Sequence, residues 1–185
     1  MPPSSPVFLV TGVPGSGKST VARALVARFR FGVHVPVDDL REWVVAGIAH
    51  PVPVWTEETG RQFGLARRAA AGVARLYAEA GFAVAVDDVL SPEDAAAAFD
   101  PPLAGLAVHR VALIPPLDVA LARNAARTTK GFDPVLLEET IRRLHRSMNA
   151  AAFRAAGWVV LDNGGQSVAE TVDAVLARTG DVHPG

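Results

Sequence analysis

A glycine-rich segment near the amino terminus has the residue types and spacing of a phosphate-binding loop. It reads Gly12-Val13-Pro14-Gly15-Ser16-Gly17-Lys18-Ser19 and follows the apolar residues 7–10. In segments of the form G-x-x-x-x-G-K-S/T, backbone N–H groups and a helix amino terminus surround the phosphates of a nucleoside triphosphate. The pattern therefore predicts that ATP is bound by this loop and the residue after it, namely by Gly12, Pro14, Gly15, Ser16, Gly17, Lys18, Ser19 and Thr20.

Two side chains at the end of this loop can take part in phosphoryl chemistry. The ammonium group of Lys18 can reach the β- and γ-phosphates, and the hydroxyl of Ser19 can join the coordination shell of Mg²⁺. Only Lys18 and Lys130 are lysines among the 18 basic residues. Since arginine is the cation everywhere else, both lysines are candidates for function, and Lys18 is predicted to be catalytic.

A pair of aspartates follows the second predicted strand. In an open α/β sheet, ligands bind beyond the carboxyl ends of the strands, so Asp38 and Asp39 should lie beside the phosphate-binding loop. A carboxylate in this place can accept the proton of a hydroxyl that attacks the γ-phosphate. We expect Asp38 to be this base, with Asp39 as the second candidate. The structural alternative is that one of the two caps a helix beginning at Leu40.

A second pair, Asp87 and Asp88, follows the third predicted strand. An apolar run that ends in aspartate resembles a Walker B strand, which predicts that Asp87 holds Mg²⁺ together with Ser19. Asp88 would then face the acceptor, although the sequence alone does not decide which of the two faces the metal. The structural alternative is a turn or capping role ahead of Ser91.

Cations on a short lid are predicted after the fourth strand. Arg123 and Arg127 are four residues apart, so they lie on one side of the predicted helix that contains them. A lid of about residues 123–134 would close over ATP, and both arginines would stabilise the charge on the transferred phosphoryl group. The structural alternative is an exposed arginine row paired with Glu138 or Glu139 on the next helix.

Strand and helix patterns alternate along the chain, which predicts an α/β fold with a parallel sheet covered by helices on both faces. Five strands are predicted, at 7–11, 34–37, 82–86, 108–114 and 158–161. Seven helices are predicted, at 18–29, 40–46, 56–80, 92–99, 117–126, 135–155 and 168–178. Because no linker or repeat divides this pattern, residues 1–185 are expected to form one domain.

Composition and charge restrict the classes of function. With 185 residues, of which 50% are hydrophobic and 20% charged, the chain can bury a sizeable core. A net charge of −1 and a pI of about 6.5 give no general attraction to nucleic acid or membranes, which disfavours a nucleic-acid partner. The absence of cysteine excludes disulfides and thiolate metal sites. The first residues resemble neither a signal peptide nor a membrane anchor, so a cytoplasmic location is expected.

Three other groups of residues give less specific indications. Trp43, Trp55 and Phe63 flank the irregular segment 47–55, and they either line an apolar pocket for the acceptor or pack in the core. The five histidines have no metal-ligand spacing, so they are interpreted as surface or hydrogen-bonded polar residues. The segment Asn163-Gly164-Gly165 is expected to contact the nucleotide base mainly through its backbone.

These motifs resemble a known family. The phosphate-binding loop, the segment Val37-Asp38-Asp39-Leu40 and above all residues 80–89 (AGFAVAVDDV) are similar to the chloramphenicol phosphotransferase-like group of P-loop kinases. The resemblance implies a three-layer P-loop NTPase fold with a five-stranded parallel sheet in the order 2-3-1-4-5. It also implies ATP- and Mg²⁺-dependent transfer of the γ-phosphate to a hydroxyl of a small-molecule acceptor, with Asp38 as the base.

A second resemblance leads to a different acceptor. Residues Asp38-Asp39-Leu40-Arg41 are also similar to the polynucleotide 5′-kinase type of P-loop kinase, in which case Arg41 would be catalytic. Over residues 47–63, the expected acceptor region, the sequence resembles neither relative. A further alternative, from another class, is a nucleotide-dependent switch ATPase, which would need a residue that positions water. We therefore expect a small-molecule kinase, with the polynucleotide kinase and the switch as alternatives.

Overall fold

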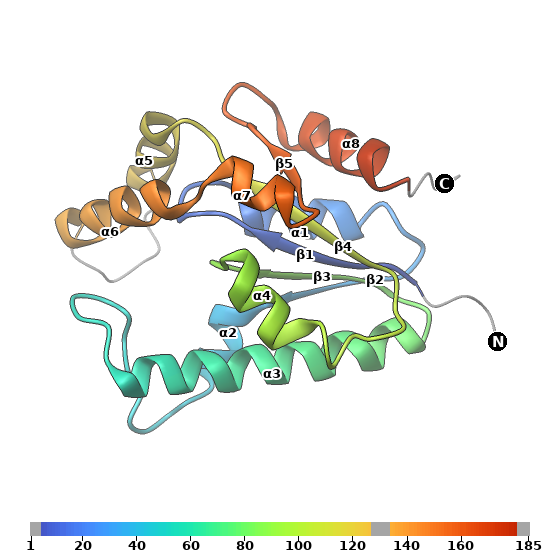
Figure 1. The fold of residues 1–185 in the computed structure, drawn as a ribbon, viewed down its shortest axis with the longest axis horizontal. Coiled ribbons are helices and arrows are strands. Elements are labelled where there is room, and N and C mark those ends of the chain that lie inside the picture. The colour runs from blue at the N-terminus through green and yellow to red at the C-terminus, as the bar shows by residue number, and fades with distance from the viewer. Residues whose placement is uncertain (1–4, 127–133, 181–185) are drawn as a thin grey trace.

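The computed structural model describes residues 5–126 and 134–180, which are arranged around one parallel sheet (Figure 1). Its strands are β1 (Val7–Thr11), β2 (Gly32–Pro36), β3 (Ala83–Asp88), β4 (Val108–Leu113) and β5 (Val159–Leu161). They lie in the order β2-β3-β1-β4-β5, and all neighbouring pairs are parallel. The fold class and the strand order predicted from the sequence are confirmed.

Helices cover both faces of this sheet. Those of the described residues are α1 (Lys18–Val26), α2 (Val37–Glu42), α3 (Glu57–Glu79), α4 (Pro92–Phe99), α5 (Leu117–Ala125), α6 (Pro134–Ser147), α7 (Ala150–Ala155) and α8 (Val168–Thr179). α1 and α8 pack on one face, around a cluster that includes Phe8 and Ala85. α3 and α4 pack on the other face, around a cluster that includes Leu9 and Val86. As far as the chain is described, none of its helices is long and apolar enough to cross a membrane.

The two central strands set the position of the site. β1 and β3 are buried along their whole length and consist mostly of valine, leucine and alanine, as expected for strands covered on both faces. β2 forms one edge of the sheet and is only partly buried. Because all five strands run in the same direction, the loop after β1, helix α2 and the end of β3 meet at the same edge.

The second strand and the helix after it begin earlier than the sequence predicts. β2 spans 32–36 in place of 34–37, and α2 begins at Val37 in place of Leu40. The cap position is Pro36, whose extended backbone (φ −74°, ψ 124°) leads from strand to helix without a loop. Asp38 and Asp39 therefore lie in the first turn of α2, and neither side chain caps it. The capping alternative for this pair is wrong.

β3 extends further than predicted, through Asp87 and Asp88. Both residues still pair with β1, opposite Val10 and Thr11 respectively. Consecutive side chains of a strand point to opposite faces. The two carboxylates, which the sequence places together after the strand, are therefore divided between the two faces of the sheet.

The predicted helix over 135–155 is two helices, α6 and α7, which are separated at Met148 and Asn149. The carboxamide oxygen of Asn149 accepts hydrogen bonds from the N–H groups of Ala151 at 2.9 Å and Ala152 at 3.2 Å. These bonds satisfy the free donors of a helix amino terminus, so a new helix begins here in place of a continuous one.

Candidate functional site

The segment between β1 and α1 has the backbone that a phosphate-binding loop requires. Gly15 and Gly17 have left-handed backbone angles, with φ of +87° for both, which residues with a Cβ rarely adopt. A Cβ at Gly15 would also collide with the backbone carbonyl of Ala120, and one at Gly12 would lie 2.7 Å from the carbonyl oxygen of Leu113. The glycines of the sequence pattern therefore occupy positions where the fold admits no larger residue.

Asn163, which follows β5, connects the loop to the far side of the sheet. Its Nδ2 donates to the backbone carbonyl of Ser16 at 2.9 Å, and both residues are buried. Ser16 Oγ and Asn163 Oδ1 have no hydrogen-bond partner among the described residues. Because buried polar atoms normally have partners, these two oxygens fit a site that a ligand completes. The sequence predicted only backbone contacts from residues 163–165, since a contact across 147 residues leaves no local signal.

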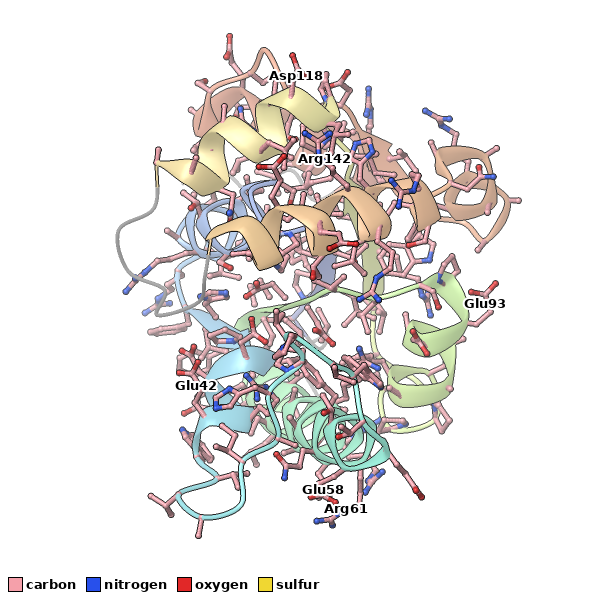
Figure 2. All side chains as sticks on the ribbon, turned by 90° about the vertical axis from the view of Figure 1, so that its left-hand side faces the viewer. Glu42, Glu58, Arg61, Glu93, Asp118 and Arg142 are labelled. Atoms are coloured by element: carbon pink, nitrogen blue, oxygen red, sulfur yellow. The ribbon has the colours of Figure 1, made fainter. Side chains whose placement is uncertain are left out.

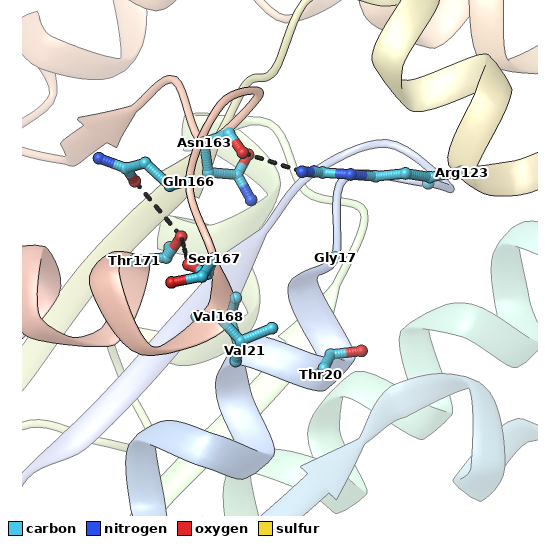
Figure 3. A pocket seen from close by; sticks show the side chains of 10 residues that line it. Gly17, Thr20, Val21, Arg123, Asn163, Gln166, Ser167, Val168 and Thr171 are labelled. Atoms are coloured by element: carbon cyan, nitrogen blue, oxygen red, sulfur yellow. Dashed lines mark hydrogen bonds between the residues drawn. The ribbon is translucent and has the colours of Figure 1, made fainter.

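A cavity of about 320 Å³ adjoins the loop on the side of α8 (Figure 3). Its lining comes from the loop, α1, α5 and the segment that leads into α8, namely from Gly15, Gly17, Thr20, Val21, Arg123, Asn163, Gln166, Ser167, Val168 and Thr171. The guanidinium of Arg123 donates to the carbonyl oxygens of Asn163 at 3.0 Å and Gly164 at 3.2 Å, which closes the wall opposite α8. The cavity thus combines the apolar side chains of Val21 and Val168 with several polar groups that a ligand could bind.

The lid predicted over residues 123–134 is described only at its two ends. Arg123 lies at the end of α5 and donates to the backbone carbonyls of Asn163 and Gly164, so its described hydrogen bonds do not go to a glutamate of the next helix. Glu138 binds Arg142, one turn further along α6, at 2.7 Å. Arg127, the other predicted catalytic arginine, lies outside the described residues, and so does Lys130.

Three side chains meet at the start of α1. Ser19 Oγ donates to Asp87 Oδ2 at 2.7 Å, and His34 Nε2 lies 2.6 Å from Asp87 Oδ1. Asp87 is buried, with 3% of its surface exposed. Burial alone would raise its pKa, but the hydrogen bond from His34, the charge of Lys18 and the hydrogen bond from Ser19 outweigh burial and hold the pKa below its ordinary value. Asp87 is therefore an ionised carboxylate inside the protein.

Ser19 and Asp87 fit a magnesium site. A hydroxyl and a carboxylate oxygen are the hard ligands that Mg²⁺ prefers, and the ion usually takes its remaining ligands from water and substrate phosphates. Asp88 points to the opposite face of β3, away from Ser19. The sequence alone did not decide whether Asp87 or Asp88 faces the metal. The geometry favours Asp87.

The sequence analysis did not single out His34 as a residue of this cluster. It was interpreted only as a surface or hydrogen-bonded polar residue. In the sheet, His34 lies opposite Ala85 and Pro36 lies opposite Asp87, so all four side chains are on one face. The period-two alternation could have shown this only with Asp87 included in the third strand, which was predicted to end at residue 86, and with the register of the two strands known.

On the other face of β3, Asp88 is paired with an arginine of α3. Arg67 Nε donates to Asp88 Oδ2 at 2.7 Å, and the N–H of Val89 donates to Asp88 Oδ1 at 2.7 Å. Burial raises the pKa of Asp88 to about 6, although Arg67 opposes this shift, and the nearby charge of Asp38 adds to it. Because the charge of Asp38 affects the pKa of Asp88, the two carboxylates are neighbours. Asp39, the next residue, is exposed.

Arg41 lies one turn after Asp38 on α2 and is buried, with 4% of its surface exposed. Its guanidinium lies 5.0 Å above the centre of the Phe63 ring and donates to the carbonyl oxygen of Ala49 at 3.3 Å. Arg41 Nε has no hydrogen-bond partner among the described residues. These contacts connect α2, the segment after it and α3.

The aromatic residues around this segment divide between core and surface. Phe63 is buried, whereas Trp55 stacks on it with a centroid distance of 5.2 Å and remains 51% exposed. Trp43 is 73% exposed and is not part of the core. Figure 2 views the molecule from the carboxyl ends of the strands, with Glu58 and Arg61 on the outer side of α3. Trp55 thus covers the buried ring of Phe63 at the amino-terminal end of α3 and presents its own ring to solvent.

Comparisons with known proteins agree with this architecture. A model of the AAA domain family matches residues 7–151. The tunicamycin resistance protein of Deinococcus radiodurans superposes with a TM-score of 0.66 at 19% identity over 98% of this chain and 99% of that one. Shikimate kinase of Acinetobacter baumannii, in complex with shikimate, gives a TM-score of 0.64 at 16% identity over 97% and 96%.

A third similar structure holds a nucleotide analogue. The APS kinase of Mycobacterium tuberculosis, in complex with AMPPNP and APS, gives a TM-score of 0.62 at 21% identity over 95% of this chain and 98% of that one. At these identities the similarity establishes a shared fold. No match was found among curated protein sequences.

The buried pair of Arg67 and Asp88 leads to a prediction about stability. At pH 7, Arg67→Met should lower the free energy of unfolding by about 3–5 kcal/mol, because Asp88 would be left buried without its cation. Urea denaturation measures the change. Arg68→Met is the matched control: this neighbouring arginine is exposed, and its loss should change stability by less than about 0.5 kcal/mol. If both variants were as stable as the wild type, the pair would not hold the helix to the sheet.

The raised pKa of Asp88 leads to a second prediction. Its pKa is about 6 in the folded protein and 3.8 ordinarily, so the folded protein keeps this proton where the unfolded chain has lost it. The contribution of Asp88 to the free energy of unfolding should therefore fall as the pH rises from about 4 to 6. Asp88→Asn has no proton to lose, so its stability relative to the wild type should improve over this interval. Parallel pH profiles of the two proteins would contradict the shift.

Proposed function

The chain belongs to the AAA domain family, and from this premise we propose that it is a P-loop kinase that transfers the γ-phosphate of ATP to a hydroxyl of a small-molecule acceptor. The observation that carries the proposal is the arrangement at the end of the glycine-rich loop, where Ser19 is bonded to the ionised Asp87 beside the charge of Lys18. Shikimate kinase and APS kinase, which share the fold, are kinases by their names. Residues 1–185 act as one kinase domain in this proposal.

The nucleotide would lie along the loop. Its phosphates would accept hydrogen bonds from the backbone N–H groups of the loop and from Lys18, which begins α1. Its base would enter the cavity of about 320 Å³ between the loop and α8. Because Arg123 closes that cavity, we assign it to nucleotide binding. Arg127 would then be the arginine that stabilises the charge on the transferred phosphoryl group.

Magnesium would be held by Ser19 and Asp87. When bound, Mg²⁺ supplies positive charge that offsets the charge of the phosphates. The protein's own groups, His34, Lys18 and Ser19, hold the pKa of the buried Asp87 below its ordinary value, which favours the charged form that a cation would bind. Lys18 adds a second positive charge on the same side of the sheet.

Asp38 would be the general base. It lies in the first turn of α2, close enough to Asp88 for its charge to raise the pKa of that buried carboxyl. In the proposed reaction, Asp38 accepts the proton of the acceptor hydroxyl as the hydroxyl oxygen attacks the γ-phosphorus, and ADP leaves.

The position of Arg41 favours a small-molecule acceptor over a polynucleotide. In the polynucleotide kinase alternative this arginine takes part in catalysis. Here it is buried between Phe63 and the backbone of Ala49, where it joins α2 to α3. This supports a structural role. A screen with labelled ATP, small hydroxyl compounds and a 5′-hydroxyl oligonucleotide tests the choice, and labelling of the oligonucleotide alone would reverse it.

Lys18→Ala tests the proposed function directly. We expect kcat to fall by at least about 10²-fold, because a positive charge aimed at the phosphates is lost. The circular dichroism spectrum should be unchanged. Arg28→Ala removes a surface cation shortly after α1 and should retain full activity. Acceptor-dependent release of ADP is the measurement, and an active Lys18→Ala variant would refute the assignment.

A comparison of the two aspartates of α2 tests the base. Asp38→Asn should lower kcat by at least about 10²-fold, since an amide cannot accept the proton. Asp39→Asn serves as the matched control, because Asp39 is the adjacent but exposed carboxylate. Its effect should be much smaller. The reverse order of effects would move the base to Asp39.

A further inference from the structure

The carboxylate of Asp87 is held from two sides by two different elements. Oδ2 accepts the hydroxyl hydrogen bond of Ser19 on α1, and Oδ1 lies 2.6 Å from His34 Nε2 on β2. A carboxylate oxygen at this distance is an acceptor for the imidazole, so we assign Nε2 of His34 as the donor. The imidazole therefore fixes one oxygen of the carboxylate while the other remains directed at Ser19.

His34 is well placed for this role by the sheet. β2 and β3 pair in parallel, with His34 opposite Ala85 and Pro36 opposite Asp87. The imidazole therefore projects from the edge strand on the same face as the carboxylate. Asp87 is buried, so loss of His34 would leave Oδ1 as a buried acceptor without this partner.

Solvent reaches His34 from outside the sheet. Two cavities, of about 520 and 500 Å³, lie along α1 and β2, and both are lined by Arg23, Ala27 and His34. The side chain of His34 is 17% exposed, compared with 3% for Asp87. A substitution of His34 therefore changes the wall of an existing groove and leaves the apolar core intact.

We propose that His34 is a positioning residue of the magnesium site, which orients Asp87 toward Ser19 and thereby sets the affinity of the protein for the divalent cation. The inference rests on the proposed function, in which Ser19 and Asp87 hold Mg²⁺. His34 contacts neither nucleotide nor acceptor in this account. Residues that orient a ligand of a metal through a hydrogen bond typically change metal affinity by about 10- to 100-fold when they are replaced.

Two substitutions separate the hydrogen bond from the volume of the side chain. His34→Phe keeps a ring of similar size but has no donor, whereas His34→Gln keeps an N–H donor at the end of a flexible chain. Binding of Mn²⁺ to the full chain with AMPPNP is measured by electron paramagnetic resonance. We expect Mn²⁺ affinity to fall about 10-fold or more in His34→Phe and to be largely restored in His34→Gln.

A control variant and a second measurement exclude a merely structural effect. His109→Phe changes another histidine of the sheet, which stacks on Phe8 with a centroid distance of 5.2 Å, and it should leave Mn²⁺ affinity unchanged. Affinity for AMPPNP in EDTA should be equal in the wild type and both His34 variants, because no metal takes part. Thermal melting checks that the variants are folded.

The outcomes distinguish this inference from the proposed function. If the wild type binds Mn²⁺ with AMPPNP and His34→Phe binds it equally well, His34 does not position the ligand and the inference fails alone. The inference also fails alone if His34→Phe loses AMPPNP affinity in EDTA to the same extent. If the wild type binds neither Mn²⁺ nor AMPPNP, the proposed function fails and the inference fails with it.

Discussion

The alternation of side chains along β3 divides the candidate site into two halves. Asp87 and Asp88 are consecutive residues of a strand, so their carboxylates must leave the sheet on opposite faces. Asp87 meets Ser19 at the start of α1, and Asp88 meets Arg67 on α3. The first half therefore lies with the glycine-rich loop and the second half with α3. A hydroxyl and a phosphate brought together for reaction would have to meet where these halves join, at the end of the central strands.

Two carboxylates buried this close together need separate compensation. An ionised group without a partner in the interior costs several kcal/mol, so each aspartate requires its own donors. Asp87 has a histidine, a hydroxyl and the charge of Lys18, and its pKa is lowered. Asp88 has one arginine and a backbone N–H, and burial still raises its pKa to about 6. Asp87, near the glycine-rich loop, therefore stays ionised to a lower pH than Asp88, near α3.

The sequence predicted the fold and the backbone of the glycine-rich loop because these depend on local patterns. The glycines of the loop are required by left-handed backbone angles and by close contact with Ala120 and Leu113, and such requirements are visible as residue types at fixed spacing. Alternating strand and helix patterns determine a parallel sheet in the same way. The position of α2 was missed because Pro36 both ends β2 and caps the helix, and no loop residues mark the boundary.

Residues that act across the sheet could not be found from spacing. His34 and Asp87 are 53 residues apart, Arg67 and Asp88 are 21 apart, and Asn163 and Ser16 are 147 apart. Each pair depends on the register of strands or on the side of a helix that faces the sheet. The contact of His34 with Asp87 was missed because the third strand was predicted to end at residue 86, so Asp87 was not placed in the sheet beside β2, and because the pairing register of two strands is not written in either one.

The segment between α2 and α3 differs from the glycine-rich loop in how it is built. The glycine-rich loop is determined by its own backbone, whereas the segment between α2 and α3 is held by side chains. Gln62 of α3 donates to the carbonyl of Gly47 and accepts from the N–H of Ala49, and Arg41 donates to the carbonyl of Ala49. Such a segment can change in sequence without loss of the fold, as long as these few contacts remain. Residues 47–63 are also where the sequence resembles neither family of kinases, which is the expected result if this segment selects the acceptor.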